Sequence, residues 1–330
     1  TAIVRIADQN GDWNPQNPAS PYYGKLVPMR KLRISAVYNG QVYYLFSGYT
    51  TDYKYTYPKN QVLGYLDITC NDGFRLLNLS NITSVTGTAA GQDTGTRINK
   101  ILDTVAWPTS MREIDTGDSL TQADPGTPRT ALGALKNVEF SEQGAFYIDQ
   151  EGDCVFHSRS WVLKKNGTNP TIFNQDGTGI GFFDVKFAYD DKLIINQATI
   201  QRIGGTAQTY GNLASVAKYF PHSLQQTNLV VDTDATAANI AAMYVATRQE
   251  TAIRIDALTL DLTTPNYGAG ITAALGINIF DTVQITAAQP GGSNITKTLQ
   301  VMSVNHDITP TSWKTTFTTS QPINLGFLLN

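Results

Sequence analysis

The sequence predicts a mainly β fold with a few helices. Thr, Val, Ile, Tyr and Phe dominate short apolar runs, and turn residues interrupt these runs about every ten residues. Asn39-Gly40 lies between two alternating runs, which is the strongest short-range signal of a β-hairpin. Only three stretches place apolar residues at helical spacing. We therefore expect an α+β fold built mainly from antiparallel sheets.

The N-terminal region is expected to form a small sheet. Segment 3–7 reads as a strand, and segment 8–28 is too rich in Pro, Asn and Gly to be regular. In the hairpin that follows, Leu32, Ile34 and Ala36 share one face, and Gly40 helps to form a type I′ turn. Segment 65–72 predicts a third strand. The second strand carries a row that we expect on one face: Tyr49, Thr51, Tyr53, Tyr55 and Tyr57.

Helices and further strands are expected in order after this sheet. A helix over 94–107 would be capped by Thr94 and stopped by Pro108, and a shorter helix covers 130–140. A hairpin turns at Glu151-Gly152, and the loop at 166–181 is the best candidate boundary between domains. Asp234 is expected to cap a third helix at 234–249. Strands are expected at 182–188, 194–203, 253–262, 282–288, 297–308 and 312–319.

The two ends of the chain repeat one pattern. Val283, Ile285 and Ala287 alternate as Leu32, Ile34 and Ala36 do, and a glycine turn follows each set. Each turn leads to a long strand that ends at a proline and then to a strand rich in hydroxyl side chains. We interpret this as one small antiparallel module used twice. The alternative is that β-rich chains contain similar meanders by chance.

The bulk composition is that of a globular protein with few charges. The chain has 330 residues, of which 41% are hydrophobic and 15% charged, and 24 basic against 27 acidic side chains give a net charge of −3. This balance argues against disorder and against a basic surface that grips nucleic-acid phosphates. No apolar run is long enough to span a membrane. We expect Cys70 and Cys154 to be buried thiols, with a single disulfide as the alternative.

The start of the chain reads as part of a folded domain. The opening stretch TAIVRIADQNGD is polar and strand-like rather than a signal peptide. Because it does not begin with Met, residues are expected to precede it.

No cluster of side chains predicts catalysis or a cofactor. His157, His222 and His306 lack other ligands at metal-binding spacing, so no metal site is expected. The nearest paired carboxylates, Asp190-Asp191 and Asp232/Asp234, lie at a strand turn and at a helix start. No nucleophile elbow or Cys–His pairing is present. We therefore expect a structural protein rather than an enzyme, with no cofactor.

Segment 12–58 is specific enough to suggest a family. Its opening, DWNPQNPASPYYGKLVPMRKLRI, resembles the start of minor tail, or baseplate hub, proteins of long-tailed bacteriophages. Segments such as LDITCNDGFRLLN and TGTRINKILDTVAWP resemble successive family segments in the same order, so the resemblance covers most of the chain and weakens after about Pro265. The motif residues include Asn14, Pro15, Asn17, Ser20, Pro21, Tyr22, Gly24, Leu26, Pro28, Arg30, Gly40, Asp72 and Gly73.

The resemblance implies a homotrimeric ring at the virion tail tip. Each subunit would contribute two tube-type, β-barrel-like domains, so three chains would present six similar units. The expected domains are 1–90, an accessory α+β domain at 91–180, and 181–330 with the helix at 234–249. The implied partners are the tail tube or distal tail protein, the tape measure protein, tip or fibre proteins, and DNA passing through the lumen. Many relatives carry lytic or fibre extensions after the last strands, and this chain shows none, which argues against a lytic role.

Two surfaces are candidates for subunit or tube contacts. One is the tyrosine row, because tyrosine is enriched at interfaces, and the other is a face of the last strand. The alternative for the tyrosine row is a solvated strand face. Other functions are a carbohydrate- or receptor-binding protein that uses the tyrosines with Trp13 or Trp161, and a peptidoglycan hydrolase. The candidates on the last strand are Thr315, Phe317 and Thr319.

Overall fold

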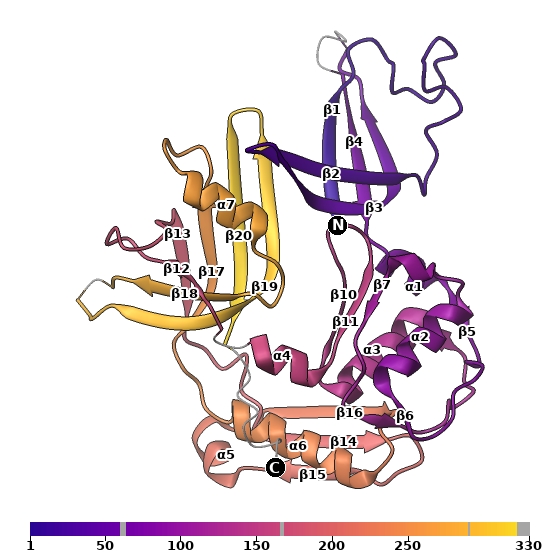
Figure 1. The fold of residues 1–330 in the computed structure, drawn as a ribbon, viewed down its shortest axis with the longest axis vertical. Coiled ribbons are helices and arrows are strands. Elements are labelled where there is room, and N and C mark those ends of the chain that lie inside the picture. Colours follow the sequence, from indigo (N-terminus) through magenta and orange to yellow (C-terminus); the bar gives the residue numbers. More distant parts are fainter. Residues whose placement is uncertain (60–63, 166–167, 290, 322–330) are drawn as a thin grey trace.

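The computed structural model describes residues 1–59, 64–165, 168–289 and 291–321. Two β-sheets lie side by side at one end of the molecule, and a helical region and a third, smaller sheet lie below them (Figure 1). The strand-rich α+β fold predicted from the sequence is confirmed.

The first sheet is formed near the N-terminus. Its strands are β1 (Ala2–Ala7), β2 (Lys31–Tyr38), β3 (Gln41–Thr56) and β4 (Tyr65–Asn71). Their order is β1-β4-β3-β2, and all pairs are antiparallel. At the β2–β3 turn, Asn39 and Gly40 have φ angles of +50° and +79°, as the predicted type I′ turn requires.

The second sheet contains six strands. They are β12 (Thr171–Phe173), β13 (Asp184–Ala188), β17 (Arg254–Asp261), β18 (Thr282–Ala287), β19 (Ile295–Thr309) and β20 (Ser312–Ser320). Their order is β12-β18-β19-β20-β17-β13, and helix α7 (Gly268–Gly276) joins β17 to β18.

The two sheets share one plan. The order β17-β20-β19-β18 repeats β1-β4-β3-β2 strand for strand, with every pair antiparallel. The long strand of each sheet also carries a bulge against the strand that follows it, at Thr51 in β3 and at Met302 in β19. The prediction of a repeated module is therefore confirmed in strand order. The irregular segment 8–30 stands where α7 stands in the second sheet.

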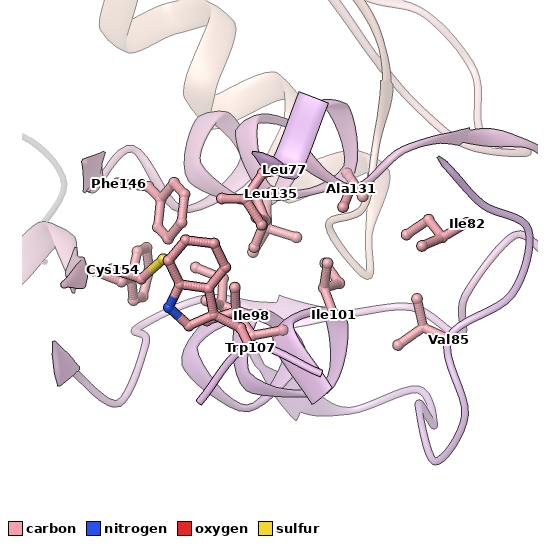
Figure 2. Close-up of a cluster of buried hydrophobic side chains, with 14 of the residues drawn as sticks. Leu77, Ile82, Val85, Ile98, Ile101, Trp107, Ala131, Leu135, Phe146 and Cys154 are labelled. Carbon is pink, nitrogen blue, oxygen red and sulfur yellow. The ribbon is translucent and has the colours of Figure 1, made fainter. Parts of the chain in front are cut away.

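A helical region connects the sheets. Its cluster of buried residues joins Leu77, Ile98, Trp107, Leu135 and Phe146 (Figure 2). Its helices are α1 (Phe74–Leu79), α2 (Thr94–Thr104), α3 (Ala131–Glu142) and α4 (Arg159–Lys165), with the 3-10 turn Thr109–Met111. Its strands are β5 (Asn81–Ile82), β6 (Gln92–Asp93), β7 (Arg112–Ile114), β8 (Leu120–Thr121), β9 (Arg129–Thr130), β10 (Ala145–Ile148) and β11 (Cys154–His157).

The segment between β13 and β17 forms a separate layer. The order β15-β14-β16 joins β14 (Gln197–Arg202), β15 (Gln208–Gly211) and β16 (Ser223–Leu229), with helices α5 (Leu213–Tyr219) and α6 (Asp234–Arg248). The Tyr244 ring of α6 stacks on Phe140 of α3, with 5.7 Å between centroids. The predicted domain 181–330 is thus divided between two sheets, because the apolar face of α6 covers β14 and meets the helical region rather than the second sheet.

Two helix starts differ from the prediction. Asp93, not Thr94, caps α2, and its carboxylate accepts the Thr96 N–H at 2.9 Å. Thr233, not Asp234, caps α6. Helix α2 also ends at Thr104, before the expected Trp107. Asp93 and Thr233, each one residue before the predicted cap, have the extended backbone that a cap requires. The type of side chain alone does not show which of two neighbouring polar residues has this backbone.

Candidate assembly surfaces

The exposed edge of the first sheet is the main candidate surface. Strand β2 is an edge strand, and its outer side has no strand partner among the residues that the structure describes. Val37 and Val42 face each other across the β2–β3 hairpin and are 70% and 51% exposed. No charged residue occurs between Arg33 and Asp52. Lys31 and Arg33 lie at the start of β2, but its second half, from Ile34 to Tyr38, carries no charge. Uncharged edge segments tend to pair with other strands, so this half of the edge is suited to a protein partner.

The first sheet also has a thin core. Among the described residues, its hydrophobic cluster contains three buried side chains, Leu66, Ile68 and Cys70, all on the inner strand β4. Leu32 on β2 and Ile6 on β1 pack against them and are half-buried. The second sheet has a much larger buried cluster. In the second sheet, β12 and β13 are added outside the shared four strands.

The tyrosine row does not lie on one face. The bulge at Thr51 adds one residue to β3, so the side chains before and after it point to opposite faces. Tyr53 pairs with Ile68 and Tyr55 with Leu66 on the core face, whereas Tyr49 pairs with Asn71 on the other face. The Tyr53 hydroxyl donates to the Val27 carbonyl at 3.2 Å. The expectation of a single tyrosine face is therefore corrected.

Tyr57 lies beyond the end of β3 and holds the start of the loop. Its hydroxyl donates to Asp8 Oδ2 at 2.7 Å, and the backbone N–H of Trp13 donates to Asp8 Oδ1 at 3.2 Å. Partial burial, together with this hydrogen bond to Asp8, raises the pKa of Tyr57 to about 12. Its ring stays 43% exposed and is the member of the row most open to a partner.

The three candidates on β20 are buried inside the chain. Thr315 and Phe317 are fully buried, and Thr319 is 6% exposed. Phe317 belongs to the core of the second sheet, and the Thr319 hydroxyl donates to the Ile255 carbonyl at 2.6 Å. This burial corrects the expectation of a contact role for these side chains. The alternate residues Lys314, Thr316 and Thr318 are the more accessible ones.

The motif residues of segment 12–58 shape the 8–30 loop. The Tyr22 ring stacks on Trp13 with 4.5 Å between centroids, and Asn14 Oδ1 accepts the Gln16 N–H at 3.0 Å. Gly24 has a φ of +71°. The loop then joins the sheet, where the Arg30 carbonyl accepts the Thr50 N–H at 2.8 Å. The loop prolines of the motif are Pro15, Pro21 and Pro28.

Two further motif residues start α1 against the helical core. Asp72 Oδ1 accepts the Phe74 N–H at 3.1 Å, which begins the helix. A Cβ at Gly73 would lie 2.7 Å from the Trp107 ring, so only glycine fits this close approach. These motif residues therefore serve the fold of the chain itself.

The two tryptophans proposed as sugar platforms already have ring partners. Trp161 lies parallel to His157 with 3.5 Å between ring centroids, and the Lys165 ammonium lies 5.3 Å from its centroid. Trp13 stacks on Tyr22. Each stacked partner covers one face of the tryptophan ring, so less of each ring is open to a sugar than the sequence suggested.

Three of the four carboxylates considered for catalysis form ion pairs, and the fourth, Asp232, accepts from the Thr236 hydroxyl at 3.4 Å. Asp190 bonds to Arg254 at 2.9 Å, Asp191 to His222 at 3.1 Å, and Asp234 to Arg202 at 2.6 Å. Arg254 lowers the pKa of Asp190, so this carboxylate is charged at neutral pH rather than suited to act as a general acid.

The structure also bears on metals, thiols and membranes. Within the described ranges, no three His, Cys, Asp or Glu residues come together to hold a metal ion. Cys70 and Cys154 are buried free thiols, and burial raises the pKa of Cys154 to about 12. No helix in the described part of the chain is long and apolar enough to cross a membrane.

Two exposed apolar side chains at the ends of α5 were not predicted. Leu213 is 83% exposed and Phe220, just after the helix, is 81% exposed. Phe220 has φ +63° and ψ 171°, a backbone conformation that is rare outside glycine. The buried Asn196 holds it there, because the Asn196 Nδ2 donates to the Phe220 carbonyl at 2.8 Å. The only signal in the sequence was the short apolar stretch NLASVAKYF.

Comparison with known proteins identifies the fold. No family model matches the sequence, and no curated protein does. A 43 kDa tail protein of prophage MuSo2 from Shewanella oneidensis is similar over 97% of this chain and 89% of its own, with a TM-score of 0.56 and 13% identity. A tail protein from Neisseria meningitidis is similar over 88% of this chain and 83% of its own, with a TM-score of 0.59 and 12% identity.

A prophage tail protein from Listeria monocytogenes, gp18, gives a TM-score of 0.50 at 11% identity over 98% of this chain and 89% of its own. At such identities the similarity concerns the fold. The chain therefore has the fold of bacteriophage tail proteins.

Proposed function

We propose that the protein is a structural, non-catalytic subunit of a phage tail, located in the virion as a hub at the tail tip. The observation that carries the proposal is the shared strand order and bulge of the two sheets within one chain. Duplication of this kind lets three chains present six similar units to a sixfold partner. The similarity in fold to prophage tail proteins supports the same role.

The contact between the sheets supports a ring. A side chain at Gly268 in α7 would come within 3.1 Å of the Tyr38 hydroxyl, so the tip of the β2–β3 hairpin lies against the second sheet's helix. Gln150 Nε2, at the turn after β10, donates to Asn278 Oδ1 at 2.9 Å. These contacts hold neighbouring units in one chain. In a homotrimer, the uncharged second half of the β2 edge would meet the neighbouring chain.

The partners follow from this position. One side of the ring would contact the tail tube or distal tail protein and the tape measure protein, and the other would carry tip or fibre proteins. DNA would pass through the lumen during ejection into the host. A carbohydrate- or receptor-binding role is less well supported, because the rings of Trp13 and Trp161 are already stacked.

The test combines mass measurement with one edge substitution. Mass photometry of the purified chain should show trimers, and Val37→Lys should shift them to monomers by placing a charge on the edge. Leu79→Lys, at an exposed apolar residue of α1 that is 56% exposed, is the matched control and should leave the trimer intact. Monomers at every concentration, also in the presence of tail-tube protein, would contradict the proposal.

A further inference from the structure

A cavity lies where the helical region meets the third sheet. It has a volume of about 440 Å³, within the range of sites that bind small ligands. Its wall is formed by α2, α3 and the chain around the end of β16, and about half of the lining residues are apolar. The polar ones are Arg97, Thr127, Arg129, Asn137 and Asn228. The apolar side chains include Ile101, Ala134, Val138, Ile203 and Val230.

A buried arginine lines this cavity. Arg97 of α2 is 1% exposed, and its Nη2 donates to the Gln122 carbonyl. Its Nε is buried and has no hydrogen-bond partner among the described residues. Burial lowers the pKa of Arg97, because a charged group loses its hydration there. A buried cation with a free donor is costly, so an unfilled partner position is indicated.

The charges around the cavity do not balance. Arg129 also lines it, but its Nη2 is paired with the buried Asp124, whose Oδ1 also accepts the Gly126 N–H at 2.9 Å. Two guanidinium groups and one carboxylate leave one positive charge. Asp124 is already engaged, so Arg97 lacks a carboxylate of its own within the described residues.

We propose that this cavity binds a carboxylate carried on a short apolar body, with Arg97 as its charge partner. The planar edge of a guanidinium matches the two oxygens of a carboxylate, and the Arg97 residue lines this cavity. One negative charge would balance the site, whereas a phosphate would bring more charge than the site can compensate. The apolar walls accept methylene groups, and one of the polar lining groups, Asn137 Nδ2, already donates to the Asn228 carbonyl at 2.7 Å. This inference does not depend on the proposed role in the tail.

The carboxylate can come from a free acid or from an acidic side chain of a protein segment. Hexanoate serves as the first probe and the peptide acetyl-Leu-Glu-Leu-amide as the second. Tighter binding of the peptide than of hexanoate assigns the site to a protein segment, and the reverse order assigns it to a small acid. In the peptide series, the version with Gln in place of Glu should not bind.

Titration calorimetry on the full chain tests the proposal without any variant. Hexanoate should bind saturably, whereas 1-hexanol and inorganic phosphate should bind at least about tenfold more weakly. Equal binding of 1-hexanol would show that the charge plays no part. Equal binding of phosphate would show that the apolar walls play no part. Either result, or no binding by hexanoate and the peptide, would overturn the proposal.

Two variants locate the binding at Arg97. Arg97→Met keeps the volume and removes the charge, so it should abolish hexanoate binding and leave the melting temperature of the free protein unchanged or higher. Arg97→Lys keeps the charge but not the planar fork and should bind about tenfold more weakly. Binding by folded Arg97→Met at the wild-type level would contradict the assignment.

Discussion

The buried carboxylate of Glu142 is expected to be a main support of the region that joins the two sheets. Glu142 is the last residue of α3 and is fully buried. Its Oε2 accepts from Thr94 Oγ1 and from the Ser119 N–H, both at 2.8 Å. Its Oε1 accepts from the N–H groups of Asp118 at 2.9 Å and Arg159 at 3.2 Å. One side chain thus joins α2, a loop and the start of α4.

Glu142→Gln tests this support with little change in shape. Glutamine keeps one acceptor oxygen and turns its NH₂ toward two donors, so at least two hydrogen bonds to a charged group are lost. At about 1.5–3 kcal/mol for each such bond, the loss of two bonds should lower the free energy of unfolding by about 3–6 kcal/mol. The change should appear in urea denaturation followed by tryptophan fluorescence, because Trp107 and Trp161 lie in this region.

Glu139→Gln on the same helix is the matched control. Glu139 accepts the Phe146 N–H at 2.8 Å and pairs with Lys136 at 2.7 Å, but it is partly exposed, and glutamine can keep the first bond. The free energy of unfolding of Glu139→Gln should fall by only about 0.5–1 kcal/mol. A Glu142→Gln protein as stable as the Glu139→Gln protein would refute the reasoning.

Three further predictions concern pH, backbone strain and the sheet edge. Burial lowers the pKa of His306 from 6.5 to about 4, so the folded state resists protonation, and the free energy of unfolding should fall by up to roughly 3 kcal/mol between pH 6.5 and 4. In His306→Gln, this fall should disappear from the free energies measured by urea denaturation across that pH range. A pH dependence equal to that of the wild type would contradict the prediction. Phe220→Gly should raise the free energy of unfolding by about 1 kcal/mol through relief of backbone strain, and a loss of stability would argue against strain. At concentrations where both proteins are monomeric, Val37→Lys should change the free energy of unfolding little, because the side chain is exposed, and a large loss there would show that Val37 supports the fold rather than assembly.

The strand-rich fold and its repeat were readable from local patterns. Asn39-Gly40 fixes a hairpin by its own backbone preference, and the alternation around Leu32 and Val283 sets which faces are apolar. The helices α2, α3 and α6 were also predicted, because apolar residues recur in them at helical spacing. The short helices α5 and α7 were not, because they are seven and nine residues long and α7 contains three glycines.

The candidate contact residues could not be placed from the sequence. The bulge at Thr51 reverses the faces of β3 without any marker residue, so Tyr49 and Tyr53 separate. Thr319 is polar and reads as exposed, but its hydroxyl is satisfied by the Ile255 carbonyl in the core. Alternation indicates two faces of a strand, but only packing shows which face is inside.

Symmetry is the most direct test of the repeated sheet as the basis of assembly. Electron cryomicroscopy of the assembled protein, alone or on a tail tube, should show three chains in a closed ring. The first and second sheets should alternate around that ring as six similar units, with β2 of each chain against its neighbour. A ring of six chains, or one in which only one of the two sheets lines the ring, would contradict the account.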